Sequence, residues 1–342
     1  MSILSDWKGM FQKLSFPKQR RYERRKESGL AAEFGLDSSF TSAEIKDISA
    51  SGIYLITEKR LSTNELITLI LREKSEPAKS TELKFSVDVR VIRQGEDGIG
   101  LSFVLPAGLD TEVWEVLVRK IVTLTNPKEI AKLFRTLRVI LFLCRLCQSG
   151  AEEAILLLGG ELLEERVETL VKIALAAEKM LASEPDFERR RAHPKLVANI
   201  LREGSWAPDE LTVQLWAGLL VSSCLFDESD DSNQMFVDLL IHIPPGPARI
   251  FIYACEQALR AASETENCPP SSVLVTQDEL AAISGVYELA RNSANVAHLS
   301  DLGLIRKPPY HNSFSSPEGF EIAPTSLGLE LYKHCHGAHG RA

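Results

Sequence analysis

Two short polar stretches near the start of the chain have residue types suited to binding a phosphorylated ligand. The first is an arginine cluster formed by Arg20, Arg21, Arg24 and Arg25. Guanidinium groups make planar, two-pronged contacts to phosphate and stack on purine faces, which lysine cannot do as well. The second is residues 47–52, DISASG, which supply acceptors for a base edge and a glycine for close backbone approach. Together they predict a site for a compact nucleotide with two phosphates.

The two stretches resemble the signature of the PilZ domain, the receptor module for cyclic di-GMP. Its pattern is R-x-x-x-R followed by [D/N]-x-S-x-x-G. Asp47, Ser49 and Gly52 match the second part at each fixed position. A glycine there permits either a positive φ or a close approach of the ligand. The resemblance implies that these three residues contact the nucleotide.

The arginine part of the signature fits this sequence in two registers. Tyr22 precedes Arg24 as an aromatic residue often does in the family, which favours the pair Arg20 and Arg24. Members with a further arginine in front of the motif favour the pair Arg21 and Arg25 instead, and both registers stay open. The resemblance assigns this full set of cyclic di-GMP contacts: Arg20, Arg21, Arg24, Arg25, Asp47, Ser49 and Gly52.

The segments around these motifs are β-like. Apolar and polar residues alternate with a period of two in residues 85–92, and short apolar runs lie at 53–56, 66–71 and 98–103. The last of these, GIGLSF, resembles the closing Gly-Ile-Gly-apolar-x-Phe strand of PilZ domains. The resemblance implies that residues 19–106 form a six-stranded antiparallel barrel.

Beyond residue 106 the apolar period changes to about 3.6, which indicates helices. The expected helices are 111–124, 127–147, 161–182, 194–202, 209–226, 233–243, 247–262 and 278–302. Residues 305–323 then predict a β-hairpin with a turn-rich tip at 308–319, and 325–336 predict a last helix. Helix, hairpin and helix in this order resemble a winged-helix unit.

The second half of the chain resembles the Abi-alpha family of abortive-infection-like proteins. The segments LWAGLLVSSC, HLSDLGLI and IAPTSLGLELYKHCHG carry the likeness, over roughly residues 195–337. That family is helical and has no established chemistry, so the likeness informs the fold rather than a mechanism. The predicted fold class is multidomain α+β. Its parts are an amphipathic helix in 1–18, the barrel in 19–106, a helical connector in 107–193 and the helical domain with its winged-helix-like end in 194–342.

Charge is distributed unevenly along the chain. Residues 1–26 carry eight Lys/Arg and two Asp/Glu, whereas residues 200–342 carry eight Lys/Arg and eighteen Asp/Glu. A basic arm on an acidic body points to an anionic partner at the arm only. The acidity of the second half argues against DNA as its partner, because phosphate contacts need Lys and Arg.

No constellation in the sequence predicts an enzyme or a metal site. Cys144 and Cys147 have the spacing of a redox or zinc pair, but they lie in an apolar helix without a second such pair. The acidic residues 227–231 lack the glycine and terminal glutamate of a calcium loop. The histidines at 334, 336 and 339 crowd the chain end. The six cysteines are expected to be reduced and buried, and no cofactor is predicted besides the nucleotide ligand.

The function predicted from the sequence is that of a cytoplasmic cyclic di-GMP receptor. Nucleotide binding would order the arginine arm and control how the helical domain meets a protein partner. Two alternatives stay open: a nucleic-acid-binding regulator that uses the winged-helix-like unit, and a barrel that no longer binds nucleotide and serves as a scaffold. Contact of residues 3–16 with a membrane surface and homo-oligomerisation are further open alternatives.

Overall fold

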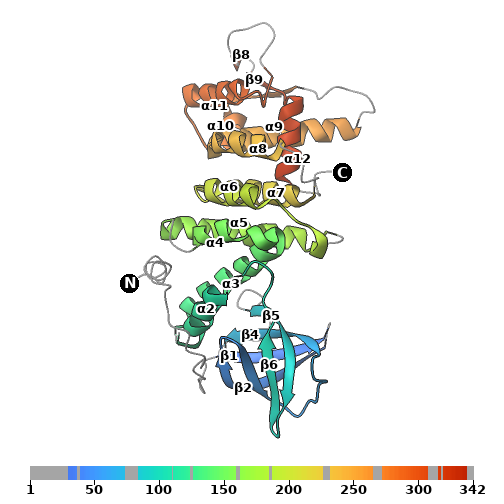
Figure 1. Cartoon of the computed structure of the whole chain (residues 1–342). Helices are drawn as coiled ribbons and strands as arrows, with labels where there is room; N and C mark the ends of the chain where they lie inside the picture. The colour runs from blue at the N-terminus through green and yellow to red at the C-terminus, as the bar shows by residue number, and fades with distance from the viewer. Residues whose placement is uncertain are drawn as a thin grey trace. The chain divides into compact units, whose positions relative to one another are not determined.

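The structure, a computed structural model, describes residues 30–36, 39–73, 84–109, 111–123, 126–158, 162–184, 187–225, 232–264, 272–306, 315–316 and 319–336. The chain divides into two compact units after Leu163. The division falls inside residues 107–193, which were expected to form one connector. The first unit holds the described strands of a β-barrel, and the second is mostly helical (Figure 1).

The barrel consists of six antiparallel strands. They are β1 (Leu30–Leu36), β2 (Ser39–Ser49), β3 (Gly52–Ile56), β4 (Leu66–Glu73), β5 (Lys84–Gln94) and β6 (Gly98–Phe103). The strand order β1-β2-β3-β6-β5-β4 closes on itself, so no strand is left as an unpaired edge. The predicted six-stranded antiparallel barrel is confirmed.

Alternate residues of the strands fill the inside of the barrel. Phe34, Leu55, Leu69, Val89 and Ile99 are each 0% exposed. Burial of one such side chain stabilises the fold by about 1.5–3 kcal/mol. Because the inner positions are taken by these apolar side chains, polar residues of the same strands are left on the outer face, where a ligand can reach them.

Two helices pack on the barrel within the first unit. They are α2 (Thr111–Thr123) and α3 (Pro127–Cys147), and a short helix α4 (Glu152–Leu156) follows. Asn126 caps α3, since its side chain accepts a hydrogen bond from the backbone N–H of Lys128. Phe85 of β5 joins the two helices to the barrel: its ring centroid lies 6.2 Å from that of Trp114 and 6.0 Å from that of Phe134.

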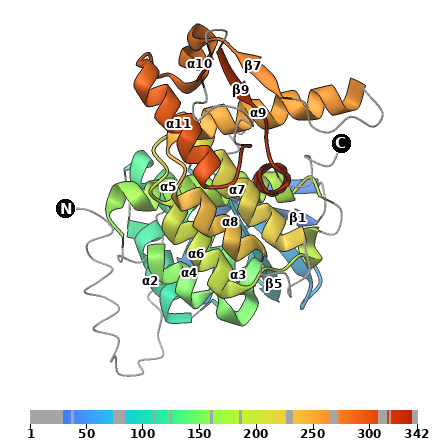
Figure 2. The same ribbon diagram turned by 90° about the horizontal axis from the view of Figure 1, so that it is seen from above.

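The second unit is built around α7 (Glu210–Leu225), a helix that is apolar on nearly all sides and buried. The helices that contact it are α5 (Glu164–Leu181), α6 (Pro194–Gly204), α8 (Ser232–Ile241), α9 (Pro245–Glu264) and α12 (Ser326–Cys335). Figure 2 shows α12 nearly end-on beside α9. In the described part of the chain no helix is long and apolar enough to cross a membrane.

The end of the second unit has the element order of a winged helix. After α9 come β7 (Val273–Val275), α10 (Gln277–Ser284), α11 (Leu289–Asp301), β8 (Ser315–Ser316) and β9 (Gly319–Ile322). The three strands form an antiparallel sheet in the order β7-β9-β8. The predicted winged-helix-like end is confirmed, and it includes two elements that the sequence analysis did not separate, β7 and α10.

Two boundaries in this region differ from the prediction. The helix expected at 278–302 is wrong as a single helix, because Gly285 adopts φ +72° and ends α10 with a left-handed cap. The hairpin tip expected at 308–319 is also wrong, since Ser315 pairs with Phe320 and so belongs to a strand. The base of the hairpin is where it was expected, at a bridge between Ile305 and Pro324.

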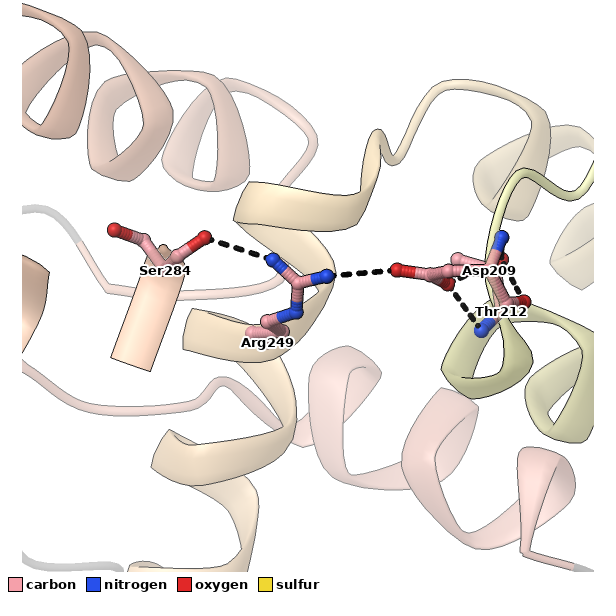
Figure 3. Close-up of polar contacts among 4 residues, drawn as sticks. All are labelled: Asp209, Thr212, Arg249 and Ser284. Carbon is pink, nitrogen blue, oxygen red and sulfur yellow. Dashed lines mark hydrogen bonds and ion pairs between the residues drawn. The ribbon is translucent and has the colours of Figure 1, made fainter. Parts of the chain in front are cut away.

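An arginine on α9 connects three segments of the second unit (Figure 3). Arg249 donates to the carboxylate of Asp209 at 2.8 Å and to the backbone carbonyl of Ser284 at 3.0 Å. Asp209 also accepts hydrogen bonds from the backbone N–H and the hydroxyl of Thr212, at 3.0 and 2.7 Å. Arg249 therefore holds the start of α7 and the end of α10 against α9.

We expect Arg249→Met to lower the free energy of unfolding by about 1–2 kcal/mol at pH 7, because two hydrogen bonds are lost. Partial burial raises the pKa of Asp209, but hydrogen bonds from Thr212 and the charge of Arg249 outweigh it and lower the pKa below its usual value. A lowered pKa contributes stability above the unfolded-state pKa that is lost as pH falls through the folded-state value.

The difference in unfolding free energy between the wild type and Arg249→Met should therefore shrink below about pH 4, near the unfolded-state pKa of aspartate. Denaturant unfolding of the two proteins from pH 3 to pH 7 measures this difference. Arg260→Met on the same helix is the control, since Arg260 lies 3.8 Å from Glu256 on an exposed surface. A constant deficit across the pH range would contradict the assigned role of the ion pair.

Candidate functional site

Four residues form one continuous row across the outer face of the barrel. Asp47 of β2 pairs with Tyr54 of β3, Tyr54 pairs with Gly100 of β6, and Gly100 pairs with Arg93 of β5. Since directly paired residues of neighbouring strands point to the same side of a sheet, the carboxylate, the phenol and the guanidinium belong to one surface. Gly100 has no side chain, so the row is open in its middle.

The adjacent row contains the rest of the Asp-x-Ser-x-x-Gly motif. Ser49 pairs with Gly52, and Gly52 pairs with Ser102. The hydroxyl of Ser49 lies 3.2 Å from that of Ser51 and donates to the carbonyl of Gly52 at 3.2 Å. The predicted residues Asp47, Ser49 and Gly52 are thus brought together on two neighbouring rows.

Gly52 is required by the sheet itself. A Cβ at this position would lie 2.1 Å from the backbone oxygen of Leu101. The described glycines with positive φ do not include Gly52, so the first of its two expected roles is wrong. The close contact that excludes a side chain is made by the antiparallel neighbour of β3, strand β6.

Two shallow depressions lie over these rows. The first measures about 230 Å³ and is lined by Asp47, Ser49, Ser51, Gly52, Ile53, Tyr54, Ile92, Arg93, Gly100, Leu101 and Ser102. The second measures about 310 Å³ and is lined by Lys46, Asp47, Tyr54, Arg93, Gln94 and Gly95. Asp47, Tyr54 and Arg93 line both, so the two depressions adjoin and form one candidate site.

Two β-bulges shape this surface. The register of β2 shifts between Ile45 and Asp47, and that of β5 shifts between Val91 and Arg93. Strict alternation after the buried Val91 would turn Arg93 into the barrel, whereas the bulge at Ile92 turns it outward. Bulges re-aim side chains in this way and are frequent beside binding sites.

A charged cluster borders the second depression. Lys46 Nζ lies 2.5 Å from one carboxylate oxygen of Asp97, and the Tyr54 hydroxyl donates to the other at 2.8 Å. The hydrogen bonds from Lys46 and Tyr54 lower the pKa of Asp97, and the hydrogen bond to Asp97 raises the pKa of each donor. Lys46 is therefore charged at neutral pH with its charge offset by Asp97, and Tyr54 keeps its proton.

A tryptophan ties the motif turn to helix α2. The indole N–H of Trp114 donates to the carbonyl of Ala50 at 2.9 Å. Trp114 is 1% exposed, and its ring meets that of Phe103 edge-on with centroids 5.1 Å apart. A partly buried carbonyl that accepts such a hydrogen bond costs stability when it is left unpaired, so the turn and α2 are coupled in position.

The predicted arginines Arg20, Arg21, Arg24 and Arg25 lie outside the described residues. The structure adds Lys46, Tyr54 and Arg93 to the lining of the site, and the sequence analysis missed all three. For Arg93 a signal existed: the alternation of β5 breaks at the apolar pair Val91-Ile92, which is how a bulge looks in a sequence.

The structure tests only part of the residues considered for metal binding, since the acidic residues 227–231 lie outside the described residues. Groups of three or more His, Cys, Asp or Glu side chains arranged to hold a metal ion are absent from the described part of the chain. Cys144 and Cys147 are buried, and burial raises the pKa of both thiols to about 12. Protonated thiols are poor metal ligands and poor nucleophiles.

Comparison with known families agrees with both halves of this architecture. Residues 18–121 match the family model of the PilZ domain, which extends over the barrel and most of α2. Residues 163–336 match the family model of abortive infection alpha, and this match starts about thirty residues earlier than the likeness noted in the sequence. No curated protein matches the chain.

The barrel with its outer-face site is thus a PilZ domain, and PilZ domains in general bind cyclic di-GMP. The second match covers just over half of the 342 residues. The chain therefore belongs to the abortive infection alpha family and carries a PilZ domain in front of its family region.

Proposed function

We propose that this protein is a cyclic di-GMP receptor whose helical second unit acts on a protein partner. The observation that carries the proposal is the outer-face site: Asp47, Ser49 and Gly52 line one open depression in a domain that matches PilZ. The carboxylate and hydroxyl groups accept hydrogen bonds from a guanine edge, and Gly52 leaves room beside the paired strands β3 and β6.

The arginine arm supplies the phosphate contacts in this proposal. Arg20, Arg21, Arg24 and Arg25 repel one another without ligand, and the two phosphates of cyclic di-GMP neutralise them. Charge-assisted hydrogen bonds contribute about 1.5–3 kcal/mol each, against about 1–2 kcal/mol for each arm residue that becomes ordered. Binding is then an order–disorder switch of the arm with micromolar or tighter affinity.

The proposed route from the site to the rest of its unit is the hydrogen bond between Trp114 and Ala50. A nucleotide that contacts Ser49 and Gly52 fixes the turn between them, and the turn holds the indole of α2. The helix α3 follows α2 directly and shares with it the contact to Phe85. Ligand-dependent ordering of the turn would thereby change the helices that lead to the family region.

Titration of the full-length protein with cyclic di-GMP by calorimetry tests the receptor function, and saturable micromolar binding is expected. Hydrogen exchange with and without ligand tests the switch. We expect protection in residues 18–60 and altered exchange in α2, α3 and the second unit. Protection confined to residues 18–60 with no change beyond 110 would contradict the control of the helical unit.

The matched variant for this experiment is Trp114→Phe. Phenylalanine keeps an aromatic ring against Phe103 but lacks the indole N–H, so the Ala50 carbonyl loses its partner. At saturating ligand the variant should keep protection at residues 47–52 and lose the exchange change in α2 and α3. A response in α2 as large as that of the wild type would show that the signal does not pass through this hydrogen bond.

A nucleic-acid-binding role for the second unit is favoured by one observation, its winged-helix topology. Topology alone does not fix function, and helix α11 has Arg291 as its only Lys or Arg. Residues 200–342 are strongly acidic, which opposes phosphate contacts. A salt-dependent gel shift with duplex DNA would support this role, and we expect none.

A further inference from the structure

Arg93 differs from the other basic residues of the candidate site. Lys46 is held by Asp97, whereas Arg93 makes no ion pair with any residue that the structure describes. It is exposed and lines both depressions. Its charge is therefore available at the point where the two depressions meet.

The position of Arg93 is set by its own strand β5 and by its neighbours Tyr54 and Gly100. The bulge at Ile92 turns it outward, and its guanidinium carbon lies 5.5 Å from the centre of the Tyr54 ring. Its side chain crosses the open position of Gly100, where a Cβ would lie 2.9 Å from Arg93 Cγ and 3.1 Å from Arg93 Nε. A cation over an aromatic face is further stabilised, and Tyr54 is itself fixed by Asp97.

We propose that Arg93 is a fixed phosphate-binding residue of the site, which contacts a phosphodiester group of the nucleotide from the barrel side. The inference rests on the proposed function and names a contact that the sequence motif does not contain. A guanidinium presents a planar pair of donors that fits two phosphate oxygens. With Asp47 in the same row, one surface then offers an acceptor for the base and a donor for the phosphate.

This placement predicts an effect on the association rate. Arg93 is placed by the bulge of β5 and by the Tyr54 ring before ligand arrives. A preformed contact costs less conformational entropy than one that must be ordered on binding. Loss of Arg93 should therefore slow association.

Calorimetry of the full-length protein with cyclic di-GMP tests the proposal, together with stopped-flow association rates. We expect Arg93→Ala to weaken binding about tenfold to hundredfold, as for the loss of one charge-assisted contact. Arg93→Lys should recover only part of the affinity. Gly100→Ala should also weaken binding, because the added methyl group displaces Arg93 while its charge remains.

Arg90→Ala is the matched control. Arg90 is exposed on the same strand and lines neither depression, so its removal changes the net charge equally and should alter the affinity less than about threefold. Equal losses at Arg90 and Arg93, or wild-type affinity in Arg93→Ala, would overturn the assignment of Arg93 and leave the receptor function standing. Absence of binding by the wild type would instead overturn the receptor function.

Discussion

Replacement of Arg20 and Arg24 together by alanine should abolish cyclic di-GMP binding while the protein still unfolds cooperatively. Each arginine offers charge-assisted contacts of about 1.5–3 kcal/mol to phosphate. Loss of two should weaken binding by about 100-fold to 10,000-fold, beyond the range of calorimetry for a micromolar site. Both residues precede β1, the first strand of the barrel, so barrel stability should not change.

The double variant Arg21→Ala with Arg25→Ala is the control that also decides the register. If Arg20 and Arg24 form the phosphate-binding pair, the second variant should lose at most about tenfold. A loss of binding only in the Arg21 and Arg25 variant would correct the register and keep the site. Unchanged affinity in both double variants would remove the arm from the binding mechanism.

The sequence predicted the barrel because its signals are local and agree with one another. The alternation in β5 and the Gly-Ile-Gly segment of β6 each indicate a β-strand. The resemblance to PilZ domains implies the six-stranded barrel that these strands belong to. The helices 127–147 and 111–124 were also predicted to within one residue. For the helix 127–147, Asn126 and Pro127 mark the start, because Asn126 caps it and proline suits its first position.

The candidate site was predicted only in part, because its remaining residues depend on register. Asp47, Ser49 and Gly52 follow one another in a motif, whereas Arg93 reaches the same surface through pairing with Gly100 and a bulge at Ile92. A period-two reading places Arg93 inside the barrel. The apolar pair Val91-Ile92 marks the bulge in the sequence, but Arg93 joins Asp47 and Tyr54 through the pairing of β3 with β6. These two strands lie far apart in the sequence, and no local pattern contains their pairing.

The split of the helix expected at 278–302 has a different cause. Gly285 can adopt φ +72° without strain, so it ends α10. Thr276 and Glu279 form a capping box, so α10 starts at Gln277. Apolar residues continue on both sides of the break, so the helical period hides it. A single glycine inside a periodic segment was here the sign of a turn.

Gly52→Val should lower the stability of the barrel and its affinity for cyclic di-GMP together. A Cβ at Gly52 would lie 2.1 Å from the Leu101 oxygen, and this atom belongs to the backbone of β6. The strands β3 and β6 must separate to admit the side chain, which breaks hydrogen bonds of the pair at Gly52 and Ser102. We expect a loss of about 4 kcal/mol or more in the free energy of unfolding.

The matched variant Gly98→Val separates the two effects. A Cβ at Gly98 would lie 1.9 Å from the Leu55 oxygen, so the same two strands are forced apart at their other end, and Gly98 lines neither depression. Melting and calorimetry on one preparation of each variant, at a temperature where both are folded, should show similar losses of stability and a larger loss of affinity for Gly52→Val. If Gly52→Val lowers the melting temperature but keeps wild-type affinity, Gly52 is needed only for the pairing of β3 with β6. A site that tolerates the displaced strand does not depend on close approach of the ligand at that point.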